Sequence, residues 1–225
     1  MPIVIAANYL LLRRILISKK QTYVLAKIIR PCLWLLVSFG YIYTIHLLFL
    51  IPIVWFVLLS VLIMGGYCVI IWQDISLEPN VLIENTLSLA LVFLGISFAS
   101  LLIAFWHWPV AIVLLLVWLF TFFVAITWLL DFSNTPQLLS SLWALMCVEL
   151  FWIMSRWVNL YHVPKTNLLV SQAALTIAAL AYGFGGIYYH YKKHSLRNAL
   201  IIEYIAVTAV IFVALILLSK WAIVV

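Results

Sequence analysis

The chain has 225 residues, of which 68% are hydrophobic and only 8% are charged. Ordinary soluble domains are about 45–50% apolar and about 25% charged, so a water-soluble fold of this size is excluded. Unbroken apolar runs of about twenty residues are typical of membrane helices and not of the alternating strands of a barrel, so the sequence predicts an all-α integral membrane protein.

The positive charge of the chain is clustered. The net charge of +6 comes from twelve Lys and Arg residues and six acids. Six of the twelve precede Pro31, and three more lie between His190 and Arg197. This clustering favours orientation toward anionic lipid over binding to nucleic acid, and we expect no nucleic-acid partner. The three cysteines lack CxxC spacing, so we expect no redox or haem-attachment role for them.

The first part of the chain is basic and amphipathic. Arg13, Lys20 and Lys27 recur at seven-residue spacing and share one helical face, which is typical of a helix lying in the membrane surface. We predict such a segment over residues 1–30, on the cytoplasmic side, followed by a transmembrane bundle over residues 31–225. A frayed basic tail is the alternative. An apolar start ahead of the first basic residues is not the order of a signal peptide, so no cleavage is expected.

Seven apolar stretches follow, each long enough for a transmembrane helix. They are Cys32–Leu50, Pro52–Trp72, Val81–Phe105, Pro109–Leu130, Leu138–Val158, Asn167–Tyr189 and Ala199–Trp221. Pro31 is expected in the first turn of the first span, where its missing N–H has no helical partner. No polar loop separates Leu50 from Val54. The first two spans therefore form a tight hairpin, or one of them does not cross.

The basic clusters give an orientation. With the N-terminus on the cytoplasmic side, six crossings bring the loop containing Lys192, Lys193 and Arg197 to the same side, and a seventh leaves the C-terminus outside. We therefore predict about seven transmembrane helices in a multi-pass protein of the cell (plasma) membrane. The expected partners are the lipid bilayer and, as a further hypothesis, other membrane helices.

Glu149 is the most informative polar residue. It lies about 16 Å from the start of the fifth predicted span, where an ionised carboxylate costs several kcal/mol unless it is paired or wetted. Arg156 follows on the same helical face, but two turns away. Two interpretations are equally supported. Glu149 binds a proton or substrate, or it is a protonated residue hydrogen-bonded to a neighbouring helix.

Two weaker polar groups follow from the predicted orientation. The outer group, a candidate vestibule, consists of His46, His107, Arg156 and His162. Their spacing is not that of metal ligands, so ordinary interfacial residues are the favoured interpretation and no metal site is predicted. The inner candidates are Glu84 and Glu203, in the first turns of their spans. Acids there are usually stabilised by the helix dipole and by ion pairs with nearby basic loops.

Three further patterns have mainly structural interpretations. His190 and His194 share a helical face, but the lysines between them disfavour a divalent metal ion. The pair Gly65–Gly66 indicates a kink or a close helix contact. Small residues form a stripe in the sixth span that suits close helix packing: Ser171, Ala174, Ala178, Ala181 and Gly185.

Sequence motifs of known chemistry are missing. The chain has no GxxxxGK(S/T) phosphate loop, no GxGxxG, no HExxH and no GxSxG, so we expect no cofactor. The first hypothesis is a small transport or permeation protein in which Glu149 binds a proton or cation. The second is a non-catalytic membrane subunit or scaffold that binds other helices or lipid. A lipid-modifying enzyme comes last. The environment of Glu149 distinguishes the first two.

Overall fold

The computed structural model describes residues 19–49, 52–75, 81–130, 135–156, 160–163 and 168–218. Within these ranges the chain forms seven helices and one antiparallel two-stranded sheet. The helices are α2 (Lys19–Phe49), α3 (Ile53–Ile75), α4 (Val81–Ala104), α5 (Val110–Leu129), α6 (Pro136–Ser155), α7 (Gln172–Lys192) and α8 (Asn198–Leu218). The strands are β1 (Leu160–Val163) and β2 (Leu168–Ser171).

The helices have the lengths that a bilayer requires. Six of those described are long and apolar enough to cross a membrane, namely α2, α3, α4, α5, α6 and α8. The remaining helix, α7, has 21 residues, so it is also about 30 Å long. Because α7 packs against α4, α6 and α8, much of its surface faces protein and not lipid. A lower mean hydropathy is therefore sufficient for this helix. The prediction of an all-α multi-pass membrane bundle is confirmed.

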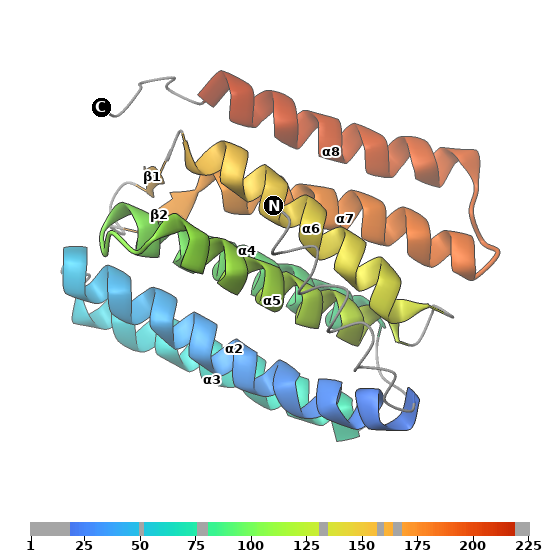
Figure 1. Cartoon of the computed structure of the whole chain (residues 1–225), viewed down its shortest axis with the longest axis horizontal. Coiled ribbons are helices and arrows are strands. Elements are labelled where there is room, and N and C mark those ends of the chain that lie inside the picture. Colours follow the sequence, from blue (N-terminus) through green and yellow to red (C-terminus); the bar gives the residue numbers. More distant parts are fainter. Residues whose placement is uncertain are drawn as a thin grey trace.

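Successive helices run in alternating directions (Figure 1). α2 lies beside α3 at one side, α4 and α5 follow, α6 and α7 come next, and α8 packs on α7 at the far side (Figure 1). The start of α2 and the α7–α8 turn lie at the same end of the bundle, which we call the basic end. The α2–α3 turn and the β-hairpin lie at the opposite end. The described part of the first basic cluster, which begins at Lys19, and the second cluster therefore share one end, as the counting of spans predicts.

α2 and α3 pack together as a tight hairpin, which is the first of the two alternatives for these spans. The backbone N–H groups of Trp55 and Phe56 donate to the Pro52 carbonyl oxygen at 2.9 and 3.2 Å, and α2 and α3 pack together. The expected helix start at Pro31 is wrong, because α2 runs through this residue from Lys19. A proline inside a membrane helix is tolerated when neighbouring groups satisfy the freed backbone. Residues 1–18 of the predicted surface segment lie outside the described ranges.

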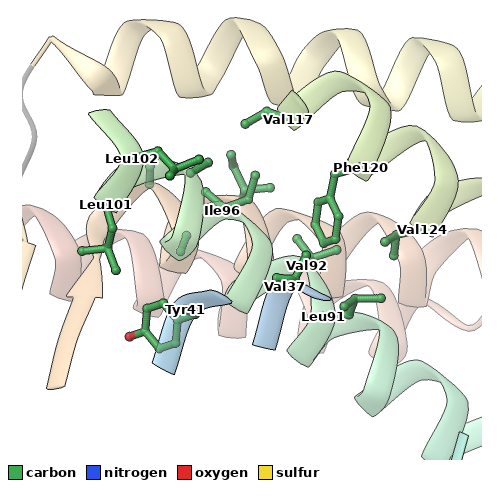
Figure 2. Close-up of a cluster of buried hydrophobic side chains, with 14 of the residues drawn as sticks. Val37, Tyr41, Leu91, Val92, Ile96, Leu101, Leu102, Val117, Phe120 and Val124 are labelled. Atoms are coloured by element: carbon green, nitrogen blue, oxygen red, sulfur yellow. The ribbon is translucent and has the colours of Figure 1, made fainter. Parts of the chain in front are cut away.

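The core surrounds α4. Buried side chains of α2, α4 and α5 meet there (Figure 2); those in the figure include Val37, Tyr41, Leu91, Val92, Ile96, Leu101, Leu102, Val117, Phe120 and Val124. Gly95 lets α5 approach closely, since a Cβ atom at this position would collide with the Phe120 ring. Tight packing of this kind replaces the hydrophobic driving force that is lacking between helices in lipid.

A β-hairpin precedes α7, whereas the sequence predicts that the sixth span begins at Asn167. β1 and β2 pair antiparallel, with Leu160 opposite Ser171, and the helix begins only at Gln172. The Oγ atoms of Ser171 and Ser100 on α4 lie 2.7 Å apart in a hydrogen bond. This contact fixes the start of α7 against the end of α4.

Small residues allow α7 and α8 to pack closely, as the sequence predicts. A Cβ atom at Gly183 would lie 2.6 Å from Oγ1 of Thr208 on α8, and one at Gly186 would collide with the Tyr204 ring. Thr208 Oγ1 also donates to the Ala179 carbonyl oxygen at 3.5 Å. These close contacts are made by glycines beside the predicted stripe; within the stripe itself, Ser171 and Ala174 are buried, and a Cβ atom at Gly185 would make only ordinary contacts of 3.7–3.8 Å with the Trp128 ring.

Candidate functional site

Glu149 lies on the outside of the bundle. Its side chain is exposed, about 20 Å from the start of α6 and about 9 Å from its end at 1.5 Å per residue. The buried side of α6 consists of other residues, among them Ser140, Ala144, Cys147 and Phe151. Relative to the described helices, the Glu149 carboxyl group therefore lies on the outer surface of the bundle and not in the packed interior.

Glu149 belongs to a stripe along the outer face of α6. The members are separated alternately by four and three residues: Leu138, Leu142, Leu145, Glu149, Trp152 and Arg156. All are exposed except the half-buried Leu145, and Leu142 and Trp152 have exposed fractions of 58% and 45%. We call this set the outer stripe. Four-three spacing is the pattern with which one helix packs along another in a left-handed coiled coil.

Arg156 ends the outer stripe at the end of the bundle opposite the basic end. Its guanidinium carbon lies 5.2 Å from the centre of the Trp152 ring, a cation–π distance. In the part of the chain that the structure covers, no ion pair joins Arg156 to Glu149. As the sequence predicts, two helical turns separate Arg156 from Glu149. Arg156 therefore does not compensate the charge of the Glu149 carboxyl group.

Among the described residues, an ion pair in the bundle interior involves other side chains. Arg30 of α2 donates from Nη1 to Oε1 of Glu84 on α4 at 2.9 Å, and from Nη2 to the Glu84 carbonyl oxygen at 3.3 Å. Ser88 Oγ accepts from Nη2 at 3.5 Å. The Arg30 and Glu84 side chains are only 6% and 15% exposed. This pair links the first and third helices near the basic end.

Sequence reasoning identified Glu84 but missed its partner. We expected basic loops to compensate Glu84, and assigned Arg30 to a surface segment before the first span. The continuous helix through Pro31 instead carries Arg30 into the bundle. One feature of the sequence could have indicated the pair: Arg30 and Glu84 both lie at the predicted cytoplasmic ends of their spans. Glu203, the second inner candidate, is exposed on α8.

The outer histidines come from three separate elements. The His46 ring on α2 lies 4.7 Å from the Phe56 ring on α3, centre to centre. His107 is exposed in the α4–α5 connection with a φ angle of 51°. The backbone of His162 pairs with Leu169 in the hairpin. All three elements end at the same end of the bundle (Figure 1). Among the side chains described, no group of three or more His, Cys, Asp or Glu residues is arranged to hold a metal ion.

Comparison with protein-family models, with curated proteins and with solved structures found no match for this chain. The functional assignment therefore rests on the site itself.

Proposed function

We propose that this chain is a non-catalytic subunit of the cell membrane that binds a helix of another membrane protein through the outer stripe of α6. The observation that supports the proposal is the exposure of Glu149 on the outer face of a membrane-crossing helix. This is the second of the two leading hypotheses from the sequence, and it accounts for the placement of Glu149 better than the first.

A carboxyl group facing only lipid tails has no hydrogen-bonding partner. Ionisable residues within membrane spans almost always face a bundle interior or a water-filled cavity and pair with other groups. Among the residues that the structure describes, Glu149 is exposed and has no ion pair or hydrogen bond. A second helix lying along the outer stripe supplies the missing partner and removes the carboxyl group from hydrocarbon.

The chemistry of Glu149 defines the partner. The partner helix carries a hydrogen-bond donor at the same depth, on a Lys, Arg, His, Asn or Gln side chain, because a carboxyl group accepts from such donors. Leu138, Leu142 and Leu145 provide apolar contacts on one side of Glu149, and Trp152 provides an aromatic contact on the other. The combination of van der Waals packing with one interhelical hydrogen bond is the usual basis of helix association in lipid.

The exposed face of α3 is different. α3 is exposed along most of its length, and its span over Ile53–Gln73 contains no charged residue. Such a face is compatible with lipid alone. An ionisable group within a span requires an additional partner, so we assign binding to α6 and not to α3.

Transport with Glu149 as a proton or cation site stays a hypothesis with less support. It requires a path for water to this carboxyl group through the bundle. The interior beside α6 is instead occupied by packed apolar side chains, including Ala144, Cys147 and Phe151, which are at most 1% exposed. Transport therefore has less support than helix binding.

Site-specific photo-crosslinking in native membranes tests this function. A photoreactive amino acid at Leu142, beside Glu149 on the outer stripe, is expected to give a protein adduct of discrete mass. The matched control is the same amino acid at Val61 on α3, since the two side chains have similar exposed fractions of 58% and 65%. Val61 is expected to give lipid adducts only.

Two substitutions of Glu149 make the test specific. Glu149→Gln retains a polar group that can hydrogen-bond and is expected to retain the adduct. Glu149→Leu removes this group and is expected to reduce the adduct at least tenfold without changing the amount of folded protein. A crosslinking yield that does not change with Glu149→Leu contradicts the proposal. An adduct of twice the mass of this chain would show that the partner is a second copy of this chain and not a different protein.

A further inference from the structure

The turn between α7 and α8 holds lysine side chains over tyrosine rings at the basic end. The Nζ atom of Lys192 lies 5.7 Å from the centre of the Tyr188 ring, and that of Lys193 lies 4.7 Å from the centre of the Tyr189 ring. Both are cation–π distances. Two adjacent ammonium groups are therefore positioned by two adjacent rings at the end of one helix.

Hydrogen bonds fix the conformation of this turn. His190 Nδ1 and Ser195 Oγ lie 3.0 Å apart, and the Ser195 backbone N–H donates to the His190 carbonyl oxygen at 3.0 Å. The Tyr204 ring of α8 packs 6.0 Å from the His190 ring. The turn then leads to Arg197, an exposed third cation immediately before α8. We call Lys192, Lys193 and Arg197 the basic turn.

Among the described side chains, no acid is paired with the basic turn. A tyrosine ring attracts a cation without cancelling its charge, whereas a carboxylate would cancel it. No ion pair connects any of the three cations to an acid among the side chains described. Arg30, another cation near this end, is paired with Glu84. Glu203 is the acid nearest in sequence, and it is exposed on α8.

From this arrangement we propose that the basic turn binds the phosphate-bearing headgroup of an anionic phospholipid. Three observations support the ligand. The cations lie at the ends of membrane-crossing helices, where headgroups are found. Tyrosine rings are amphipathic and favour the same depth. Each Lys or Arg near an anionic membrane surface strengthens binding by about fivefold. The site is separate from Glu149 and does not depend on the proposed function.

Metal binding by the same segment is less consistent with the structure. His190 and His194 have the spacing noted in the sequence, but His190 is hydrogen-bonded to Ser195. His194 follows the helix in the left-handed region, with a φ angle of 51°, so helical geometry no longer places it above His190. Cations on both sides also repel a divalent ion. An anionic ligand is the better match for the charge of the turn.

Native mass spectrometry of the purified chain in detergent tests this site. Phosphatidylglycerol, which carries one negative charge, is expected to bind at least tenfold more tightly than zwitterionic phosphatidylcholine. The triple substitution Lys192→Gln, Lys193→Gln and Arg197→Gln is expected to weaken phosphatidylglycerol binding by about 100-fold, which follows from about fivefold per cation. A triple variant that binds phosphatidylglycerol like the wild type overturns the proposal.

Matched variants separate charge from folding. Lys192→Arg with Lys193→Arg keeps the charge and is expected to retain binding within about twofold, because Arg also forms cation–π contacts. Glu203→Gln removes the neighbouring acid and is expected to tighten phosphatidylglycerol binding several-fold. Unchanged or weaker binding in Glu203→Gln contradicts an electrostatic headgroup site. This variant also tests the proposal if the triple variant does not fold.

A competition experiment identifies the source of the phosphate group. Inorganic phosphate in tenfold excess is expected to leave phosphatidylglycerol bound, because the lipid also gains from its position in the micelle. Displacement of the lipid by inorganic phosphate would show a site for free anions and overturn the lipid assignment.

Discussion

Arg30 on α2 and Glu84 on α4 form an ion pair with an N–O distance of 2.9 Å across 54 residues of sequence. The carbonyl oxygen of Glu84 and the hydroxyl of Ser88 accept further hydrogen bonds from the same guanidinium group. The pair is largely buried near the basic end, with side chains that are 6% and 15% exposed. It is the clearest polar link between the first helix and the core helix α4.

Arg30→Leu is expected to lower the free energy of unfolding by about 3 kcal/mol, because it removes the buried cation that pairs with the Glu84 carboxylate. The double substitution Arg30→Leu with Glu84→Leu is expected to recover most of this loss, since it removes both charges. Unfolding by denaturing detergent, monitored by circular dichroism, measures both variants. Equal destabilisation in the single and double variants would contradict a coupled pair.

Gly65 and Gly66 provide a matched test of helix packing. A Cβ atom at Gly66 would collide with the ring of Trp34, which is held by a 2.9 Å hydrogen bond from its Nε1 to the Ile63 carbonyl oxygen. No atom lies within 4 Å of the corresponding position at Gly65. Gly66→Ala is expected to lower the free energy of unfolding by about 1–3 kcal/mol.

Gly65→Ala is expected to be neutral or stabilising by up to about 1 kcal/mol, because alanine favours a helix more than glycine does. The same detergent titration compares the two variants. Since the residues are adjacent in one helix, a similar loss in both would indicate a general effect of substitution and would count against the Trp34 contact.

His107 occupies an exposed turn with a φ angle of 51°. This left-handed conformation is unfavourable for residues with a branched Cβ and favourable for glycine. His107→Gly is therefore expected to raise the free energy of unfolding by about 1 kcal/mol, and His107→Val to lower it by a similar amount. Thermal unfolding in micelles measures both. The reverse order would show that the imidazole makes contacts that outweigh backbone strain.

The two ends of the bundle are expected to face opposite sides of the membrane. In a variant without native cysteines, a single cysteine at Ser195 in the α7–α8 turn should react with impermeant reagents only from the cytoplasmic side. A single cysteine at Trp106 in the α4–α5 connection should react only from outside. Labelling of both positions from one side would exclude the alternating arrangement of the helices.

The fold was predictable because few backbone structures can satisfy their own hydrogen bonds in lipid. Long apolar runs indicate helices from composition alone, and clustered lysines and arginines indicate which ends lie together. The structure confirms helices in all seven expected stretches. Local departures from the predicted helices were not predicted where they involve contacts between distant segments. The hairpin before α7 contacts α4 through the Ser100–Ser171 hydrogen bond between distant segments, and no local pattern indicates this contact.

The candidate site was predictable only in part, for a related reason. Depth along a helix follows from counting residues, so the sequence identified Glu149 as a carboxyl group within a span. The direction in which Glu149 points depends on which face of α6 packs against the bundle. Both faces of α6 are largely apolar, so the sequence could not distinguish them. Arg30 was missed because Pro31 suggested a helix boundary that α2 does not have.

The most direct test of the account asks what surrounds residue 149 in the isolated chain. A nitroxide label at Glu149→Cys, in liposomes and without native cysteines, is compared with labels at Leu142 and at the fully buried Ala144. We predict that residue 149 behaves like residue 142, with frequent collisions with oxygen and few with a water-soluble nickel complex. Frequent collisions with nickel would reveal a water-filled path and contradict the assignment of Glu149 to a lateral binding face.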